Sequence, residues 1–240
     1  MSIRTRSMVD FLRHRIPFLA GSTSMPLHLP LHWDAIYGDL DMDFEWGGIS
    51  PTDVASSLSR EAKLPTGPTL VIGAGASRLA SALYVEGYKP IVQSDFSTTI
   101  VAKRADDEIP YLQADATSRE AYERLADALG DEPLNIVDKG LIDGLYISSS
   151  THLIASVVSA GHGALSRNGS FVFYSYTHPS YMTPCLGLGA GMSFDLRVNK
   201  CLGDSIYLYH LKKRPEGERR KTPRSKRHQQ KSIDSRRKQK

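Results

Sequence analysis

Five short apolar segments alternate with segments of helical pattern, and this alternation constrains the fold more than any other feature of the chain. The predicted strands, each with a core of aliphatic or aromatic residues, are LVIG (70–73), PIVQSD (90–95), IPYLQAD (109–115), LNIVDKG (134–140) and GSFVFYSY (169–176). Helices are predicted between them at Ser77–Glu86, Ser97–Arg104, Ser118–Leu129 and His152–Ala160. Such alternation is typical of an α/β protein with a parallel sheet and helices on both of its faces.

The pattern changes after the fifth predicted strand. Two further extended segments, MSFDLRVN (192–199) and SIYLYHLK (205–212), are separated by a short turn that contains Gly203. Short turns of this kind join antiparallel strands. We therefore expect the sheet to be mostly parallel and to end in an antiparallel hairpin.

Charge is distributed unevenly over the 240 residues. From Lys212 to the C-terminus there are 14 Lys and Arg against 3 Asp and Glu, which leaves 16 basic and 23 acidic residues in the rest of the chain. A tail with so few apolar residues cannot offset the entropy cost of ordering it. We predict a basic N-terminal extension or capping helix at 1–30, one acidic domain at 31–212, and a disordered basic tail at 213–240.

Several classes of protein are disfavoured by composition. The chain contains no run of 18 apolar residues, which argues against a membrane-spanning helix. Cys185 and Cys201 are too few for a disulfide framework or, alone, for a zinc site, so no metal is expected. We expect a cytoplasmic protein; the Arg-rich N-terminus leaves a mitochondrial location open, and the tail leaves nuclear import or a non-specific RNA contact open.

Small and acidic residues follow the predicted strands, where ligands bind in open parallel sheets. Gly73 and Gly75 follow the first strand, and Ser77 opens the next helix, so a ligand can approach the backbone there. Asp95 ends the second strand, where a carboxylate can accept both hydroxyls of a ribose. Asp115, at the end of the third strand, is placed for an adenine amino group. Asp138 ends the fourth strand and is followed by Lys139 and Gly140.

Two nucleotide cofactors could use this plan. A nicotinamide site is typified by G-x-G-x-x-G, whose third glycine is replaced here by Arg78. An S-adenosylmethionine site needs the G-x-G turn, the ribose acid, the adenine acid and the antiparallel hairpin, and all four occur in serial order. S-adenosyl-L-methionine is therefore the predicted cofactor.

These motifs resemble those of a methyltransferase-like family that includes the lysine methyltransferases of elongation factor 1-alpha. The similar segments, in order, are Trp33-Asp34 with Tyr37, Phe44-Glu45-Trp46, LVIGAGASRL (70–79), Asp95-Phe96-Ser97, Asp115-Ala116, IVDKGLIDGL (136–145) and Asn168 to Pro184, ending YSYTHPSYMTP. The sequence departs from the family pattern in the glycine loop, at Ala74 and Ala76. The resemblance implies a Rossmann-like, seven-stranded class I methyltransferase sheet.

The resemblance also implies a set of cofactor contacts. Together with the glycine loop and the fourth strand end, the predicted cofactor-binding residues are Trp33, Tyr37, Trp46, Gly73, Gly75, Ser77, Asp95, Phe96, Asp115, Ala116, Asp138 and Lys139. The aromatic members are suited to a sulfonium cation, which is attracted to the faces of aromatic rings.

The activity that the resemblance implies is methylation of a protein lysine, for example in a translation elongation factor. A lysine amine must lose its proton before it attacks a methyl group, and the candidates near the strand ends are Asp143, Tyr176 and His178. Two alternatives stay open: an RNA or small-molecule methyltransferase that uses the basic tail, and a degenerate methyltransferase fold that acts as a binding module.

Overall fold

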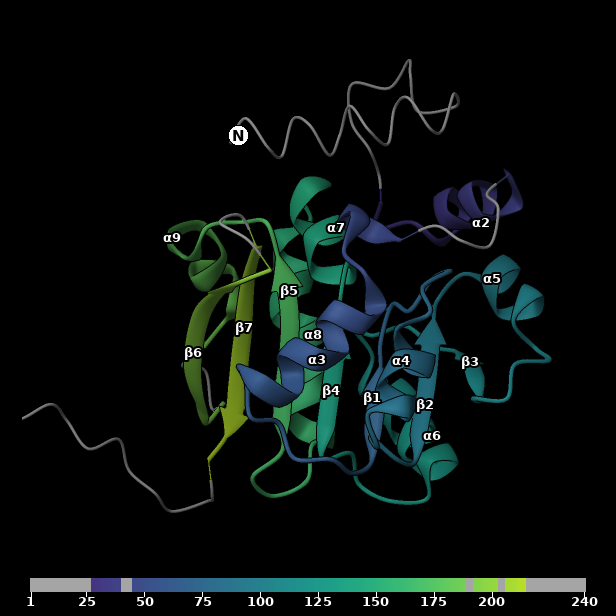
Figure 1. The fold of residues 1–240 in the computed structure, drawn as a ribbon. Coiled ribbons are helices and arrows are strands. Elements are labelled where there is room, and N and C mark those ends of the chain that lie inside the picture. Colours follow the sequence, from purple (N-terminus) through teal and green to yellow (C-terminus); the bar gives the residue numbers. More distant parts are fainter. Residues whose placement is uncertain (1–26, 40–44, 189–191, 203–205, 215–240) are drawn as a thin grey trace, which may run out of the picture.

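A seven-stranded sheet forms the centre of the structure, a computed structural model that describes residues 27–39, 45–188, 192–202 and 206–214 (Figure 1). Its strand order is β3-β2-β1-β4-β5-β7-β6. The parallel strands are β1 (Thr69–Val71), β2 (Ile91–Asp95), β3 (Tyr111–Gln113), β4 (Asn135–Asp138) and β5 (Ser170–Ser175); the antiparallel strands are β6 (Phe194–Cys201) and β7 (Ile206–Lys213). The predicted mixed sheet is confirmed, and the turn with Gly203 lies outside the described residues.

The strands β1, β2, β4 and β5 are buried along their whole length, as is usual for parallel strands covered on both faces, whereas the edge strand β3 is only partly buried. In β1, Leu70 pairs with Val92 of β2 and Ile136 of β4, and these three side chains belong to the core on one face. Neighbouring Val71 and Val137 belong to the core on the other face. Each strand therefore contributes alternate side chains to two cores.

Helices cover both faces of the sheet, as predicted (Figure 1). One face packs against α3 (Pro51–Arg60), α4 (Leu79–Val85) and α5 (Thr98–Lys103), and the other against α6 (Arg119–Leu129), α7 (Leu141–Ile147) and α8 (Thr151–Ala164). Among the described residues, no helix is long and apolar enough to cross a membrane.

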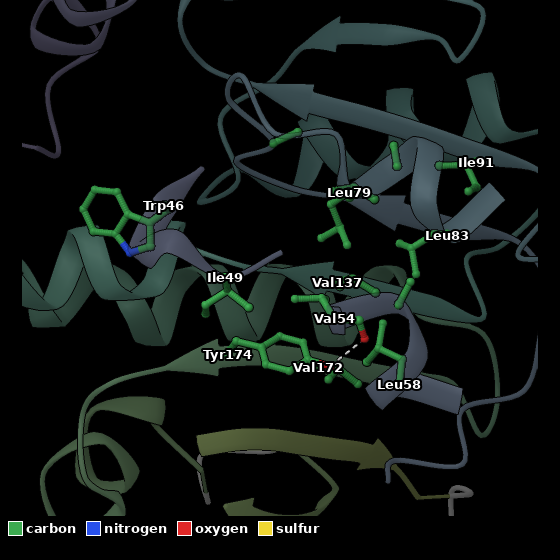
Figure 2. Close-up of a cluster of buried hydrophobic side chains, with 14 of the residues drawn as sticks. Trp46, Ile49, Val54, Leu58, Leu79, Leu83, Ile91, Val137, Val172 and Tyr174 are labelled. Carbon is green, nitrogen blue, oxygen red and sulfur yellow. Dashed lines mark hydrogen bonds between the residues drawn. The ribbon is translucent and has the colours of Figure 1, made fainter. Parts of the chain in front are cut away.

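The core between α3, α4 and the sheet fixes where the N-terminal part of the chain lies (Figure 2). Val54 and Leu58 of α3 are fully buried beside Val172 and Tyr174 of β5. The Tyr174 hydroxyl, which would be costly to bury alone, donates to the Val54 carbonyl oxygen at 3.2 Å. This packing holds α3 under the carboxyl edge of the sheet, and with it the residues that precede α3.

Helix ends follow local capping signals. In α6, the Ser118 side chain accepts a hydrogen bond from the Ala121 amide, and Gly130 ends the helix in the left-handed region at φ 77°. The predicted helix at 77–86 is shorter in the structure, because α4 begins at Leu79.

The prediction omitted three helices, namely α2 (Pro30–Asp39), α3 and α7, together with the short elements η2 (Trp46–Gly48), α9 (Pro179–Met182) and η3 (Thr183–Leu186). The described helices and strands run from α2 to β7, and the domain bounds 31–212 stay a prediction. The predicted extension at 1–30 lies, up to residue 26, outside the described residues, as does the predicted tail from residue 215.

Candidate functional site

A cavity of about 230 Å³ lies at the carboxyl ends of the parallel strands, somewhat smaller than the roughly 300–1,000 Å³ of most ligand pockets. Segments that follow β1, β2, β3 and β4 line it, together with residues of α2, η2, α7 and α8. Of the predicted cofactor residues it brings together Trp33, Tyr37, Trp46, Gly73, Gly75, Ser77, Asp95, Phe96, Asp115, Ala116 and Lys139. The carboxyl edge of the sheet thus places side chains from distant parts of the sequence around one space.

The glycine loop after β1 has no room for side chains at its two glycines. Gly73 and Gly75 have φ values of 55° and 53°, a region that glycine enters without strain. A Cβ at Gly73 would lie 2.6 Å from the Leu141 Cβ, and a Cβ at Gly75 would overlap the Tyr37 hydroxyl. The loop therefore presents bare backbone to the cavity.

Asp95 connects the end of β2 to this loop. Its two carboxylate oxygens accept hydrogen bonds from the amides of Gly75, at 3.1 Å, and Ser97, at 3.0 Å. Burial raises the pKa of the carboxyl to about 6. Because each carboxylate oxygen can accept more than one hydrogen bond, Asp95 keeps acceptor capacity for hydroxyl groups of a ligand.

The glycine loop is also held by its carbonyl groups. The Tyr111 hydroxyl donates to the Gly75 carbonyl oxygen at 3.0 Å, and buried Arg104 donates to the Ala76 carbonyl oxygen at 3.1 Å. Arg104 is paired in turn with Asp107 at 2.5 Å. The sequence prediction did not include Arg104 or Tyr111, because their partners lie 28 and 36 residues away in the chain.

The part of the cavity next to β3 combines an acid with apolar side chains. Asp115 accepts hydrogen bonds at 2.8 Å from both the amide and the hydroxyl of Thr117. The apolar lining around this part consists of Ala116, Leu141, Leu145, Leu153 and Val157. An apolar wall beside an exposed carboxylate suits a flat ring that carries an amino group.

Three aromatic rings line the cavity from the N-terminal side. The rings of Trp33 and Tyr37 are stacked, with centroids 5.4 Å apart, and Trp46 lies 6.1 Å from Trp33 at a tilt of 51°. The Trp33 indole donates to the Leu27 carbonyl oxygen at 2.7 Å. Such a cluster can attract a cation to its ring faces.

Helix α2, which carries two of these rings, is bound to α5. The Asp34 carboxylate accepts hydrogen bonds from the Ser97 hydroxyl and the Thr99 amide, at the beginning of α5. At the end of α5, Lys103 donates to the carbonyl oxygen of Tyr37, at 2.5 Å. An acid thus meets the positive end of α5, and a base meets the carbonyl end of α2, as helix dipoles favour.

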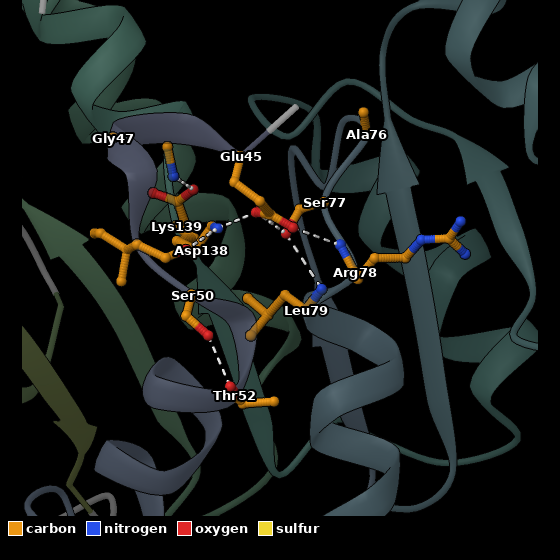
Figure 3. A network of polar contacts seen from close by, with 12 residues as sticks. Glu45, Gly47, Ser50, Thr52, Ala76, Ser77, Arg78, Leu79, Asp138 and Lys139 are labelled. Atoms are coloured by element: carbon orange, nitrogen blue, oxygen red, sulfur yellow. Dashed lines mark hydrogen bonds and ion pairs between the residues drawn. The ribbon is translucent and has the colours of Figure 1, made fainter. Parts of the chain in front are cut away.

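Lys139, after β4, forms part of a polar network on the cavity wall (Figure 3). Its ammonium forms an ion pair with Glu45 and donates to the Ile49 carbonyl oxygen at 2.9 Å. Burial lowers the pKa of the amine, although Glu45 acts against this shift. Glu45 stands between two aromatic residues of a motif that resembles the family, but the prediction did not assign it a role.

Asp138 is the one predicted cofactor residue that lies outside the cavity lining formed by the described residues. It is completely buried and accepts hydrogen bonds from the amides of Gly140, Leu141 and Ile142 at 2.8, 2.7 and 3.0 Å. Burial raises its pKa to about 6. Asp138 thus satisfies the free amides at the beginning of α7.

The three predicted catalytic candidates lie beside β5, and none is among the described residues that line the cavity. Buried Asp143 accepts hydrogen bonds from the Ser175 hydroxyl and from the Tyr176 amide, and burial raises its pKa to about 7. The Tyr176 hydroxyl donates to the Gly47 carbonyl oxygen at 2.6 Å. His178 is exposed and caps α9 by accepting from the Ser180 amide at 3.2 Å.

In the described part of the chain, no group of three His, Cys, Asp or Glu side chains is placed to hold a metal ion. Of the three catalytic candidates, Asp143 is the one whose pKa burial raises toward neutrality, and its side chain is buried outside the cavity lining.

Searches with the sequence found no matching protein-family model and no matching curated protein. Solved structures do match. A structure from work on the conversion of a disulfide bond into a thioacetal group during echinomycin biosynthesis has a TM-score of 0.55 and 13% identity, and the match covers 88% of this chain and 100% of that chain.

Two further matches are named as methyltransferases. The N-methyltransferase NodS from Bradyrhizobium japonicum, solved with S-adenosyl-L-homocysteine, has a TM-score of 0.53 and 12% identity over 77% of this chain and 98% of its own. A protein from Methanococcus maripaludis, assigned as an S-adenosyl-L-methionine-dependent methyltransferase, has a TM-score of 0.50 and 16% identity over 79% and 94% of the two chains. At these identities the matches establish the fold, which is the Rossmann-like fold of class I methyltransferases.

Proposed function

We propose that the protein is a methyltransferase that uses S-adenosyl-L-methionine. The observation that carries this proposal is the cavity, in which the glycine loop, Asp95, Asp115 and an aromatic cluster follow one another around the carboxyl edge of the sheet. The structural neighbours support it, since two of them are named as methyltransferases and one was solved with S-adenosyl-L-homocysteine.

The residues of the cavity fit this cofactor by their chemistry. Asp95 would accept the ribose hydroxyls, the apolar wall beside Asp115 would take the adenine, and the rings of Trp33 and Trp46 would face the sulfonium. When bound, the cofactor supplies an electrophilic methyl group. The contribution of the chain is then to position the acceptor and to exclude water from it.

We propose a protein lysine as the methyl acceptor, with elongation factor 1-alpha as the first candidate. The motif resemblance supports this choice, and so does the excess of 23 acidic over 16 basic residues before the basic C-terminal tail, since an acidic surface favours a basic partner. A cytoplasmic location and a non-specific contact between the tail and RNA belong to the same proposal.

Asp143 is the group we propose to hold the proton that the amine releases. A carboxyl with a pKa of about 7 is divided between its two forms at neutral pH, which suits a general base. The hydrogen bonds from Ser175 and Tyr176 fix its orientation at the end of β5. Asp143 belongs to α7, whose Gly144 and Leu145 line the cavity, so the proposed base is adjacent in sequence to the cofactor site.

Transfer of a radiolabelled methyl group tests the proposed activity. The full-length chain is incubated with labelled S-adenosyl-L-methionine and, in parallel, with elongation factor 1-alpha, total RNA and a small-molecule extract. We expect label in the elongation factor, on lysine. Label in RNA or in small molecules would show that the acceptor is not a protein lysine, but the protein would still be a methyltransferase. The absence of label from all three would favour a binding module.

A further inference from the structure

Glu45 lies between the beginning of α4 and the end of β4 and contacts both. Its carboxylate accepts hydrogen bonds from the Arg78 amide at 2.9 Å and from the Ser77 hydroxyl at 2.8 Å, both after β1 (Figure 3). The same carboxylate forms the ion pair with Lys139 after β4. Glu45 thereby fixes the ammonium of Lys139 relative to the glycine loop.

The geometry leaves Lys139 with capacity for a ligand. An ammonium group has three N–H donors, of which one is directed to Glu45 and another to the Ile49 carbonyl oxygen. Lys139 also lines the cavity although its side chain is only 5% exposed. The remaining donor can therefore meet an anionic group inside the cavity.

The order of groups along the sheet edge gives the cavity a direction. The strands that bound it are ordered β4, β1, β2, β3, so that Lys139 comes first, then the glycine loop, then Asp95 and finally Asp115. The proposed cofactor has a matching order of an amino-acid end, a ribose and an adenine. Its carboxylate would then belong beside Lys139.

Two further contacts hold the backbone that follows Glu45. The Trp46 ring fills the space beside Gly140, where a Cβ would come within 2.8 Å of it, and the Tyr176 hydroxyl donates to the Gly47 carbonyl oxygen. Glu45 is thus directed from a fixed turn rather than from a free loop, which favours preorganisation over adjustment when a ligand binds.

We propose that Glu45 is a positioning residue, which orients Lys139 to bind the carboxylate of the amino-acid end of the cofactor. This role rests on the proposed function of the cavity. The variant Glu45→Gln keeps the size of the side chain, but its amide has one acceptor oxygen in place of two and no charge. It cannot accept from Ser77, Arg78 and Lys139 as the carboxylate does.

Calorimetric titration with two ligands separates this role from a merely structural one. S-adenosyl-L-homocysteine has the amino-acid end, and 5′-methylthioadenosine lacks it. In Glu45→Gln we expect affinity for the first ligand to fall by about tenfold, as for the loss of one hydrogen bond to a charged group, and affinity for the second to change less than about twofold. Lys139→Met, which leaves Glu45 bound to Ser77 and Arg78, is expected to show the same selective loss.

Glu123→Gln is the matched control, because Glu123 forms an exposed ion pair with Arg119 on α6, at 3.3 Å. It should leave both affinities unchanged, and melting temperatures of the free proteins identify any variant that is merely unstable. If Glu45→Gln lost affinity equally for the two ligands, or for neither, the proposed role of Glu45 would be overturned. The cofactor site itself would still be supported as long as the wild type binds S-adenosyl-L-homocysteine. Failure of the wild type to bind S-adenosyl-L-homocysteine would instead overturn the proposed function, and this role with it.

Discussion

The two sides of the carboxyl edge differ in how their polar groups are used. On the side of β1, β2 and β3, Gly75 and Asp95 line a cavity and are held by hydrogen bonds from beneath it. On the side of β5, Asp143, Tyr176 and His178 bond to nearby backbone or hydroxyl groups outside that cavity. Under the proposed function, cofactor binding and acceptor chemistry would be carried by separate groups, so that single substitutions should separate them.

The largest expected effect is at Gly75, on the cavity side. In Gly75→Ala, the new Cβ would overlap the Tyr37 hydroxyl and the residue would be strained at φ 53°. We expect affinity for S-adenosyl-L-homocysteine to fall by at least about 100-fold, which corresponds to about 2.7 kcal/mol, measured by calorimetry.

Gly130→Ala is the control for this prediction. Gly130 also has a positive φ, of 77°, but no atom lies within 4 Å of its Cβ position at the end of α6. Its free energy of unfolding should fall by about 1 kcal/mol through backbone strain, and its affinity for S-adenosyl-L-homocysteine should be unchanged. If both alanine variants bound the ligand equally well, the glycine loop would not be part of the site.

On the β5 side, a substitution at Asp143 is expected to reduce methyl transfer. In Asp143→Asn the amide can still accept from Tyr176 but cannot hold a proton at neutral pH. We expect methyl transfer to fall by about 100-fold, within the usual range for a general base. Affinity for S-adenosyl-L-homocysteine should stay within about twofold. A parallel loss of binding and transfer would place Asp143 with the cofactor residues and remove the distinction between the two sides.

The buried carboxyl of Asp143 should also make the free energy of unfolding depend on pH. The pKa of Asp143 is about 7 in the folded protein against an ordinary 3.8, so the folded state holds a proton that the unfolded state releases between these values. The resulting stabilisation is complete below pH 4 and is lost as pH rises through 7. Relative to Asp143→Asn, the wild type should therefore lose about 3 kcal/mol of unfolding free energy between pH 5 and pH 8.

Denaturant unfolding at the two pH values measures this difference. Asp95, whose pKa is also raised to about 6, is present in both proteins, so its effect is shared by them, whereas Asp138 interacts electrostatically with Asp143 and contributes to the measured difference. A constant difference between wild type and variant would show that the carboxyl of Asp143 is not buried as described.

A smaller effect is expected at Lys103, which joins α5 to α2. Lys103→Met removes the hydrogen bond to the Tyr37 carbonyl oxygen but keeps an apolar stem of similar length. Because α2 carries Trp33 and Tyr37, we expect cofactor affinity to fall by about threefold, as for loss of a single hydrogen bond at a partly exposed site. A change beyond tenfold would mean that the attachment of α2 controls the site.

Much of the sheet could be predicted because its central strands have short buried apolar cores, and because β2 and β4 end at aspartate while Gly73 follows β1. The same pattern pointed to Gly75 and Asp95, since Gly75 lies in the loop after β1 and Asp95 is the last residue of β2. Helix α7 could not be predicted, because it begins at Leu141, directly after the predicted strand at 134–140. The hydrogen bond from the Leu141 amide to Asp138, which helps to start the helix, has no local sequence signal.

The supporting residues could not be predicted for a different reason. Glu45 contacts Lys139, which is 94 residues away in the chain, and Arg104 contacts Ala76, which is 28 residues away. No local pattern encodes such contacts. They depend on how α3 and the strands bring distant segments to one edge of the sheet.

Calorimetric titration of the wild-type chain with S-adenosyl-L-homocysteine, and separately with NADH, tests the central claim most directly. The account predicts binding of S-adenosyl-L-homocysteine at micromolar concentration and no binding of NADH, since Arg78 replaces the third glycine of a nicotinamide site. Binding of NADH alone, or of neither ligand, would contradict the assignment of this cavity to S-adenosyl-L-methionine.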